Sequence, residues 1–310
     1  MNANRKNEPR QAAKTSNIKS IAILSAKGGT GKTSIAVSIG YLLAHCGFKT
    51  LLVDMDLFTH GITVYTLASY PGEIAVTLTD IFTEMDNGGH IHPFLIPDSF
   101  TNDKLFILPS IDENRATGGA QVFLSKRFNN VAPFTMKLKD VLSETFANYG
   151  FDYVVIDTRG GPDHTSIGAA LATGSYIVVT EADKPSWSMN RLLMHATDEM
   201  EKKTDMHARR EGFIINKNVL PPGNIENFLK QKWGISHLGT IPSDIQATRC
   251  FQENKTPVSE NTGCAFSEAV IGIVEKSLFS ETWAIGKQRM LKRLTQRQGL
   301  LPTLLDILKI

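Results

Sequence analysis

The chain has 310 residues, of which 42% are hydrophobic and 21% are charged, so fibrous and globally disordered classes are excluded. Its 33 Lys and Arg residues nearly balance 31 Asp and Glu residues, and the net charge of +2 does not by itself indicate a nucleic-acid partner. The three cysteines lack CxxC spacing, which argues against a zinc site, a disulfide framework or a cluster scaffold and fits a reducing cytoplasm. We expect one large domain with tails.

The first 19 residues are polar and basic, and we expect them to form a flexible arm. They lack the apolar run of a secretory signal, and no part of the chain reaches the roughly 18 uninterrupted apolar residues of a membrane span. We therefore expect a soluble or peripherally attached protein. The arm is also too short for a helix-turn-helix domain, so sequence-specific DNA reading is not expected.

Short β-branched runs alternate with helical patterns from residue 20 to 280, which predicts one domain with βαβ units. The expected strands are Ile21–Ser25, Thr50–Asp54, Leu105–Leu108, Tyr153–Asp157, Tyr176–Thr180, Gly212–Asn216 and His237–Ile241. The expected helices are Thr33–Cys46, Thr165–Ala172, Ser188–Glu201, Ile225–Trp233 and Phe266–Leu278. Continuously apolar strands indicate burial on both faces, so we predict an α/β fold, doubly wound, with a mainly parallel sheet and helices on both faces.

Two segments do not fit this alternation. Residues 62–100 contain several prolines and glycines, and loops with short helices are expected there. Residues 281–310 form a basic, leucine-rich C-terminal segment.

A glycine-rich loop follows the first strand and leads directly into a helical pattern. Backbone N–H groups of such a loop turn inward around phosphate oxygens, and the helix adds the positive end of its dipole. Lys32 is expected against the β- and γ-phosphates, and the Thr33 hydroxyl is expected to ligate Mg²⁺. The remaining expected phosphate contacts are Gly28, Gly29, Thr30, Gly31 and Ser34.

An additional lysine, Lys27, opens this loop. The pattern Lys27-Gly-Gly-x-Gly-Lys32-Thr33 resembles the deviant Walker A motif of the ParA/MinD ATPases. The resemblance covers roughly residues 19–280 and implies a P-loop NTPase fold with ATP and Mg²⁺ as cofactors. It also implies an ATP-dependent homodimer, in which Lys27 reaches the partner's phosphates and takes part in catalysis together with Lys32.

Acidic residues follow two of the expected strands, at the sheet edge where α/β proteins bind ligands. In the resembling family the stretch Asp54-Met55-Asp56 forms a first switch, where Asp56 orients the attacking water and Asp54 helps to organise Mg²⁺. Asp157 ends an apolar strand in a Walker B arrangement and is expected to hold Mg²⁺ through water. The following loop departs from the family because its proline comes late, and Arg159 within it could contact a phosphate, a partner subunit or an adaptor.

The resemblance also places two residues near the adenine base. Asn216 ends a strand, and its amide can both accept from and donate to a purine edge. A simple turn role for Asn216 is the alternative. The turn at Pro242 resembles the second wall of the same pocket.

Other P-loop ATPase classes fit less well. Cys250 and Cys264 lie beyond the regions that supply ligands to the bridging iron–sulfur cluster of the related reductases. The chain has one phosphate loop, unlike the duplicated metalloid-pump ATPases, and its last tyrosine is Tyr176, so it lacks the terminal tyrosine cluster of the bacterial kinases.

The surface on which such a protein acts is left open by the sequence. The alternatives are a partition ATPase with non-specific DNA contact, a membrane-linked positioning ATPase, and a regulatory partner whose ATP binding controls docking to a protein activator or adaptor. The corresponding location is the cytoplasm, with peripheral contact to the nucleoid or the inner membrane. The basic residues and leucines of 287–310 could form a lipid-binding helix, but Pro302 interrupts it, so packing on the core or protein docking is favoured.

Overall fold

The computed structural model describes residues 19–67, 76–83, 93–97, 100–111, 130–219 and 223–296. Within these ranges eight strands form one sheet in the order β3-β4-β2-β5-β1-β6-β7-β8. All neighbours pair in parallel except β3 with β4, which are antiparallel. The strands are β1 Ser20–Leu24, β2 Thr50–Asp54, β3 Phe94–Leu95, β4 Leu105–Leu108, β5 Tyr153–Asp157, β6 Ser175–Thr180, β7 Arg209–Asn218 and β8 His237–Pro242.

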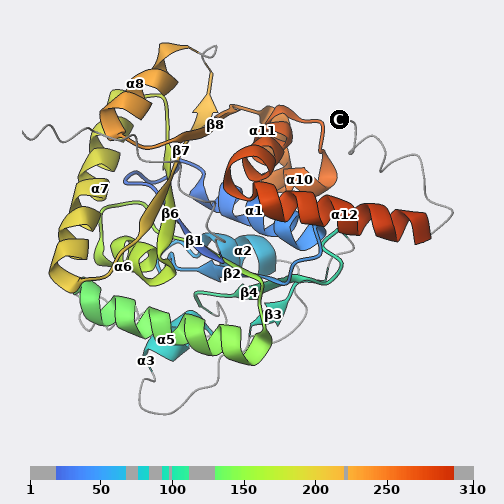
Figure 1. Ribbon diagram of the computed structural model, residues 1–310, viewed down its shortest axis with the longest axis horizontal. Coiled ribbons are helices and arrows are strands. Elements are labelled where there is room, and N and C mark those ends of the chain that lie inside the picture. The colour runs from blue at the N-terminus through green and yellow to red at the C-terminus, as the bar shows by residue number, and fades with distance from the viewer. Residues whose placement is uncertain are drawn as a thin grey trace, which may run out of the picture.

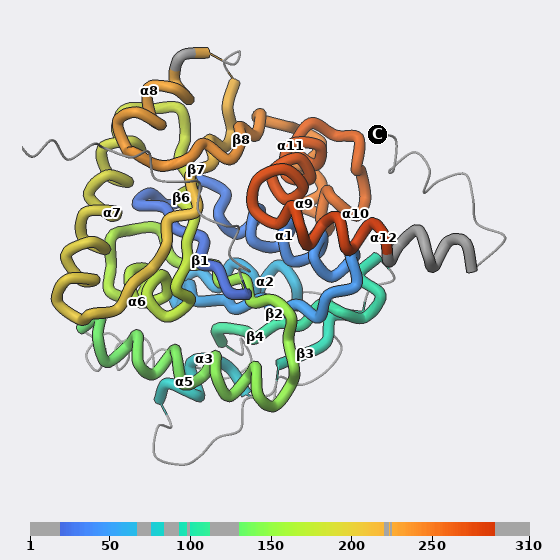
Figure 2. The backbone as a smooth tube through the Cα atoms, in the orientation of Figure 1, coloured from blue at the N-terminus to red at the C-terminus, as the bar shows by residue number. Residues whose placement is uncertain are grey.

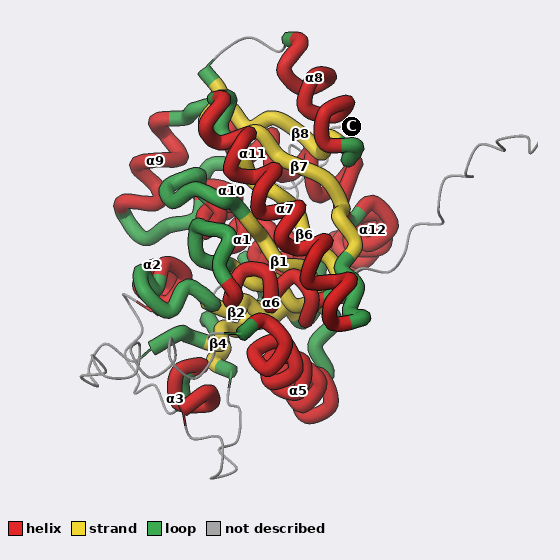
Figure 3. The backbone as a smooth tube through the Cα atoms, turned by 90° about the vertical axis from the view of Figure 1, so that its left-hand side faces the viewer, coloured by secondary structure: helices red, strands yellow, loops and turns green. Residues whose placement is uncertain are grey.

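Helices cover both faces of this sheet, as Figures 1 and 3 show from two directions. One layer contains α3 (Leu78–Thr83), α5 (Val131–Tyr149), α6 (His164–Thr173), α7 (Lys184–Thr204) and α8 (Asn224–Trp233). The other contains α1 (Lys32–His45), α2 (Gly61–Leu67), α9 (Ile245–Gln252), α10 (Pro257–Glu260), α11 (Ala265–Ile273), the π-helical turn η1 (Val274–Leu278) and α12 (Ser280–Gln296). The fold predicted from the sequence is confirmed.

The two layers enclose two separate cores because successive strand side chains point to opposite faces. In β5, Val154 and Ile156 enter the core beneath α5 and α6, whereas Tyr153 and Val155 enter the core beneath α1 and α11. Every residue of β5 is buried. This explains why the central strands read as continuous apolar runs rather than as an alternating pattern.

The strand order brings the chemically important loops together. β1 lies between β5 and β6, and β5 lies between β1 and β2. The chain therefore changes winding direction at β1, and the loops that leave the carboxyl ends of β1, β2 and β5 meet beside α1. The tube view in Figure 2 shows β1 in the middle of the sheet with α1 next to it.

The sequence predicted the seven parallel strands but only some of the helices. The helix Val131–Tyr149 was not expected at all. α7 begins at Lys184, four residues before the expected Ser188, because Pro185 occupies its first turn and Asp183 caps it. Residues 62–100 do contain short helices, α2 and α3, in the part that is described.

The beginning of the C-terminal segment packs on the core. Trp283 is 7% exposed, and the Thr282 hydroxyl lies 2.6 Å from the Tyr153 hydroxyl. Lys287, counted among the basic residues of the segment, pairs with Glu275 at 2.8 Å. Residues 297–310, including Pro302, lie outside the described residues, so the preference for packing or protein docking over lipid binding stays a prediction for that part.

Candidate active site

The glycine-rich loop connects β1 directly to α1, as expected for a phosphate loop. Gly31 is the N-cap of α1 and has φ 87°, a left-handed conformation that glycine adopts without strain. A Cβ atom at this position would lie 2.2 Å from Asn216 Nδ2, so a larger residue would also clash. The helix N-terminus thus opens onto Gly28, Gly29 and Thr30, with its free N–H groups and positive dipole end available for an anion.

Lys32 is the first residue of α1, and only 6% of its surface is exposed. Burial lowers the pKa of its ammonium group, and the nearby carboxylates of Asp157, Asp56 and Asp163 oppose that shift. A buried cation surrounded by acids at the end of a phosphate loop is arranged to receive a further anion.

Thr33 and Asp157 meet directly. The Thr33 hydroxyl donates to Asp157 Oδ2 at 2.5 Å, while Asp157 Oδ1 is buried and has no hydrogen-bond partner among the described residues. Burial raises the pKa of Asp157 to about 7, although Lys32 acts to lower it. A hydroxyl beside a carboxylate with one unsatisfied oxygen fits Mg²⁺, which keeps several waters and takes few protein ligands. Within the described residues no cluster of three or more His, Cys, Asp or Glu side chains could hold a metal ion alone.

Asp54 is the register partner of Asp157 on the neighbouring strand. Its carboxylate accepts hydrogen bonds from Thr63 N at 2.8 Å, Thr63 Oγ1 at 2.6 Å, Ser110 Oγ at 3.1 Å and Asp56 N at 3.1 Å. Complete burial nevertheless raises its pKa to about 6. In this arrangement Asp54 fixes the loop after β2, which is compatible with an indirect part in organising a metal site.

Asp56 belongs to the same loop and forms its tight turn. Its Oδ1 accepts from Phe58 N at 3.1 Å and Thr59 N at 3.0 Å, and its Oδ2 accepts from Thr59 Oγ1 at 2.5 Å. The carboxylate therefore holds its own loop, and Oδ2 retains capacity to accept a further hydrogen bond, such as one from a water.

The loop after β5 presses on the phosphate loop and reaches the loop after β2. A Cβ atom at Gly160 would lie 2.7 Å from Gly28 N, so only glycine fits there. The Arg159 guanidinium carbon lies 3.9 Å from the centroid of the Phe58 ring, a cation–π contact. Arg159, whose role the sequence left open, thus links the loops that follow β5 and β2.

The two residues expected near the base lie at the ends of β7 and β8. Asn216 is buried, and its amide donates to Thr30 O at 2.7 Å, so it supports the phosphate loop in this structure. Pro242 ends β8 opposite Asn218. A contact of either residue with adenine stays a prediction.

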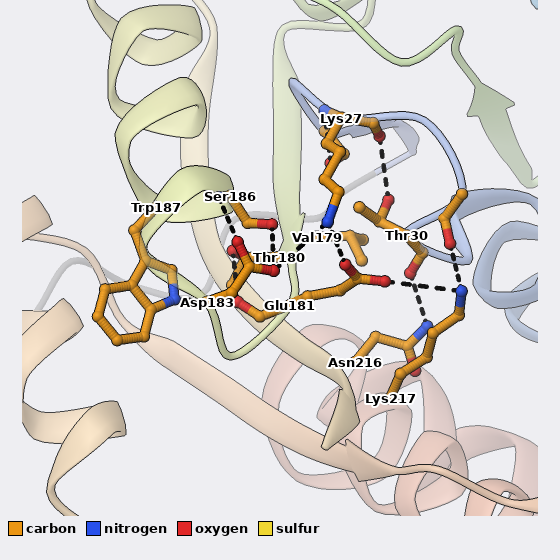
Figure 4. A network of polar contacts seen from close by, with 12 residues as sticks. Lys27, Thr30, Val179, Thr180, Glu181, Asp183, Ser186, Trp187, Asn216 and Lys217 are labelled. Carbon is orange, nitrogen blue, oxygen red and sulfur yellow. Dashed lines mark hydrogen bonds and ion pairs between the residues drawn. The ribbon is translucent and has the colours of Figure 1, made fainter. Parts of the chain in front are cut away.

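Lys27, at the start of the loop, pairs with two acidic side chains. Figure 4 shows its ammonium group directed toward Glu181 and Asp183, which follow β6. The carboxylate of Glu181 also faces Lys217.

Sequence reasoning missed the residues that support the predicted ones. Glu181, Asp183 and Ser110 lie within three residues of the carboxyl end of a strand, so the rule that pointed to Asp54 and Asp157 could have found them. Thr63 lies in the short helix α2, and no signal in the sequence marks it.

A family model described as "AAA domain" matches residues 18–209, which span β1, the phosphate loop, Asp56 and Asp157. The chain belongs to the ParA/MinD-type P-loop ATPase family. Among curated members of this family, the septum site-determining protein MinD of Buchnera aphidicola is 22% identical over 264 residues, covering 81% of this chain and 88% of that protein.

Solved structures of ParA/MinD-type ATPases share the fold. MinD from Pyrococcus horikoshii in complex with Mg-ADP has a TM-score of 0.63 at 20% identity and covers 83% of this chain and 95% of that one. A plasmid partition protein from Borrelia burgdorferi has a TM-score of 0.57 at 22% identity and covers 77% and 95%, respectively. In the described part of this chain, no helix has the length and apolarity needed to cross a membrane.

Proposed function

We propose that this protein is an ATP-dependent switch that binds Mg²⁺–ATP, dimerises and hydrolyses the nucleotide slowly in order to position or partition a cellular cargo. The solved relatives include a MinD bound to Mg-ADP and a plasmid partition protein, which supports both the cofactors and the general role.

The contact between Thr33 and Asp157 carries this proposal. It places a hydroxyl, a carboxylate with an unsatisfied oxygen and the buried Lys32 around the same helix N-terminus. Phosphoryl transfer depends mainly on positioning and on neutralising charge, and these groups supply both.

Each remaining residue has a role within this site. Lys32 and the backbone of the phosphate loop hold the β- and γ-phosphates, and Thr33 and Asp157 hold Mg²⁺, which neutralises developing charge when bound. Asp54 fixes the loop that carries Asp56. Asp56 orients the attacking water, and Lys27 reaches the partner's phosphates and so couples nucleotide binding to dimerisation.

The proposal also includes the partner and the cellular surface to which the protein binds. Dimerisation creates a surface on which a protein activator or adaptor docks, and the cargo is held through non-specific DNA contact in the cytoplasm at the nucleoid. Peripheral membrane contact through the C-terminal segment is the alternative, and Trp283 shows that the beginning of that segment is occupied in core packing.

Calorimetric titration of Thr33→Val with ATP tests the function. Removing the hydroxyl should abolish the gain in affinity that Mg²⁺ gives the wild type, while metal-free ATP binding persists. Thr248→Val is the matched control, because the Thr248 hydroxyl bonds only to the helix carbonyl of Asp244 among the contacts described here. Equal Mg²⁺ dependence in Thr33→Val and the wild type would refute the assigned site.

A further inference from the structure

Two lysines and two carboxylates meet beside the phosphate loop, at the carboxyl ends of three adjacent strands. Lys27 follows β1, Glu181 and Asp183 follow β6, and Lys217 lies near the end of β7. Figure 4 shows Glu181 between the two lysines. The sequence predicts a role for only one of these four charged residues, Lys27.

Glu181 uses one carboxylate oxygen for each lysine. Its Oε2 lies 2.7 Å from Lys27 Nζ, and its Oε1 lies 3.6 Å from Lys217 Nζ. Asp183 Oδ2 adds a longer contact to Lys27 at 3.4 Å. Lys217 also donates to the carbonyl of Gly29. The two positive and two negative charges of this cluster balance.

The fold holds the backbone of Glu181 and the carboxylate of Asp183 in place, whereas the side chain of Lys27 is more exposed than that of Glu181. The backbone carbonyl of Glu181 accepts from Trp187 Nε1 at 2.9 Å, and Asp183 caps α7 by accepting from Ser186 N at 2.7 Å. The Glu181 side chain is 22% exposed, but that of Lys27 is 45% exposed. An exposed lysine is therefore held by acceptors that lie at the start of α7.

We propose that Glu181 is a positioning residue that holds Lys27 within its own subunit and so keeps the chain from dimerising before nucleotide is bound. This inference rests on the proposed function, in which Lys27 reaches the partner's phosphates. Lys27 can satisfy one set of anions at a time, so the contact with Glu181 competes with the contact across the dimer.

The competition is readily reversible. Exposed ion pairs shift an equilibrium by only about two- to five-fold, and salt screens them. A triphosphate carries more negative charge than a carboxylate and can draw Lys27 away. The hydrogen bond to Glu181 raises the pKa of Lys27, as expected for an ammonium group that is held by a carboxylate.

Acylation of lysines in the nucleotide-free protein, followed by mass spectrometry, directly tests whether Glu181 restrains Lys27. Glu181→Gln should raise the labelling rate of Lys27 by about two- to five-fold. Labelling of Lys217 should rise less, because the Gly29 carbonyl still accepts from it. Glu253→Gln is the matched control, since it frees Lys255, 3.1 Å away, and should leave Lys27 unchanged. An unchanged labelling rate of Lys27 in Glu181→Gln overturns the inference.

Light scattering at increasing Mg²⁺–ATP concentration then tests whether the contact between Glu181 and Lys27 opposes dimerisation. Glu181→Gln should dimerise at about two- to five-fold lower ATP than the wild type. A higher ATP requirement would mean that Glu181 guides Lys27 toward the partner, which overturns the inference. Lys27→Ala separates the two proposals: if it dimerises like the wild type, the proposed function fails, whatever the labelling of Glu181→Gln shows.

Discussion

Lys32 is a cation that the fold buries without a direct ion pair among the contacts described here, and its pKa is lowered by that burial. Such a group is unfavourable unless a ligand compensates it. We therefore predict that Lys32→Ala weakens ATP binding by about 10- to 100-fold, the loss expected for a charge-assisted hydrogen bond, without lowering the melting temperature. Calorimetry measures the ATP affinity, and thermal unfolding followed by circular dichroism measures the melting temperature. Lys255→Ala, an exposed lysine elsewhere, is the control, and retained ATP affinity in Lys32→Ala would contradict the assignment.

Asp56 holds its own loop and has a proposed role in hydrolysis, and one substitution can separate the two. Asp56→Asn keeps an oxygen that can accept from Phe58 N and Thr59 N, so the loop should stay folded. It removes the charge that, in the proposed function, orients the attacking water, and we predict about 100-fold slower phosphate release with ATP binding retained. Wild-type turnover in Asp56→Asn would assign the water to another residue.

The pKa of Asp157 near 7 makes stability depend on pH. The folded state binds the proton of Asp157 more tightly than the unfolded chain, so the stability associated with this group is present below about pH 4 and is lost as pH rises through about 7. Asp157→Asn removes this effect. Urea unfolding of the metal-free proteins should show that Asp157→Asn gains stability relative to the wild type between pH 5 and pH 8, on the order of a few kcal/mol. If the difference in unfolding free energy between Asp157→Asn and the wild type were the same at pH 5 and pH 8, the raised pKa of Asp157 would be contradicted.

Among the secondary-structure elements, the carboxyl ends of the strands supply the residues of the candidate active site. β1, β2 and β5 each end in a loop with a predicted residue, and the parallel register sets Asp54 beside Asp157. Apolar runs followed by Asp or glycine are visible in the sequence, so the sheet and the phosphate loop could be predicted from it.

What the sequence could not predict was set by tertiary contacts. The helix Val131–Tyr149 is stabilised by packing against α6 and the core, in contacts that include Phe134 and Leu138. The state of Lys27 depends on Glu181, 154 residues away in the chain, and that of Asp54 depends on Ser110, 56 residues away. Local patterns carry no information about such pairs.

The helix α12 packs on the other core, the one beneath α1 and α11, and most of it belongs to the C-terminal segment 281–310. Trp283 is buried on the core side of this helix, while Ile285 is 47% exposed. Trp283→Ala should lower the free energy of unfolding by about 3 kcal/mol and reduce Tm, because the cavity it leaves cannot be filled. Ile285→Ala, on the same helix, should change stability by less than about 0.5 kcal/mol. Equal effects of the two substitutions in thermal unfolding would show that α12 does not anchor to the core.

For the whole molecule, two cores on a mainly parallel sheet support the loops at its carboxyl edge. Gly160 presses on the phosphate loop, and Arg159 stacks on Phe58. A nucleotide that displaces the phosphate loop therefore acts on the loops after β2 and β5 together. These loops and Lys27 lie at one edge of the sheet, which is the edge we expect a second copy of the chain to cover.

The central claim is that Mg²⁺–ATP joins two copies of the chain through Lys27. Light scattering with Mg²⁺–ATP measures it most directly when hydrolysis is blocked by Asp56→Asn. The mass of Asp56→Asn should rise from the monomer's 34.1 kDa to about twice that value. The double variant Lys27→Ala/Asp56→Asn should bind ATP and stay at 34.1 kDa. An ATP-dependent dimer of that double variant, formed at the same ATP concentration as the dimer of Asp56→Asn, would contradict the claim.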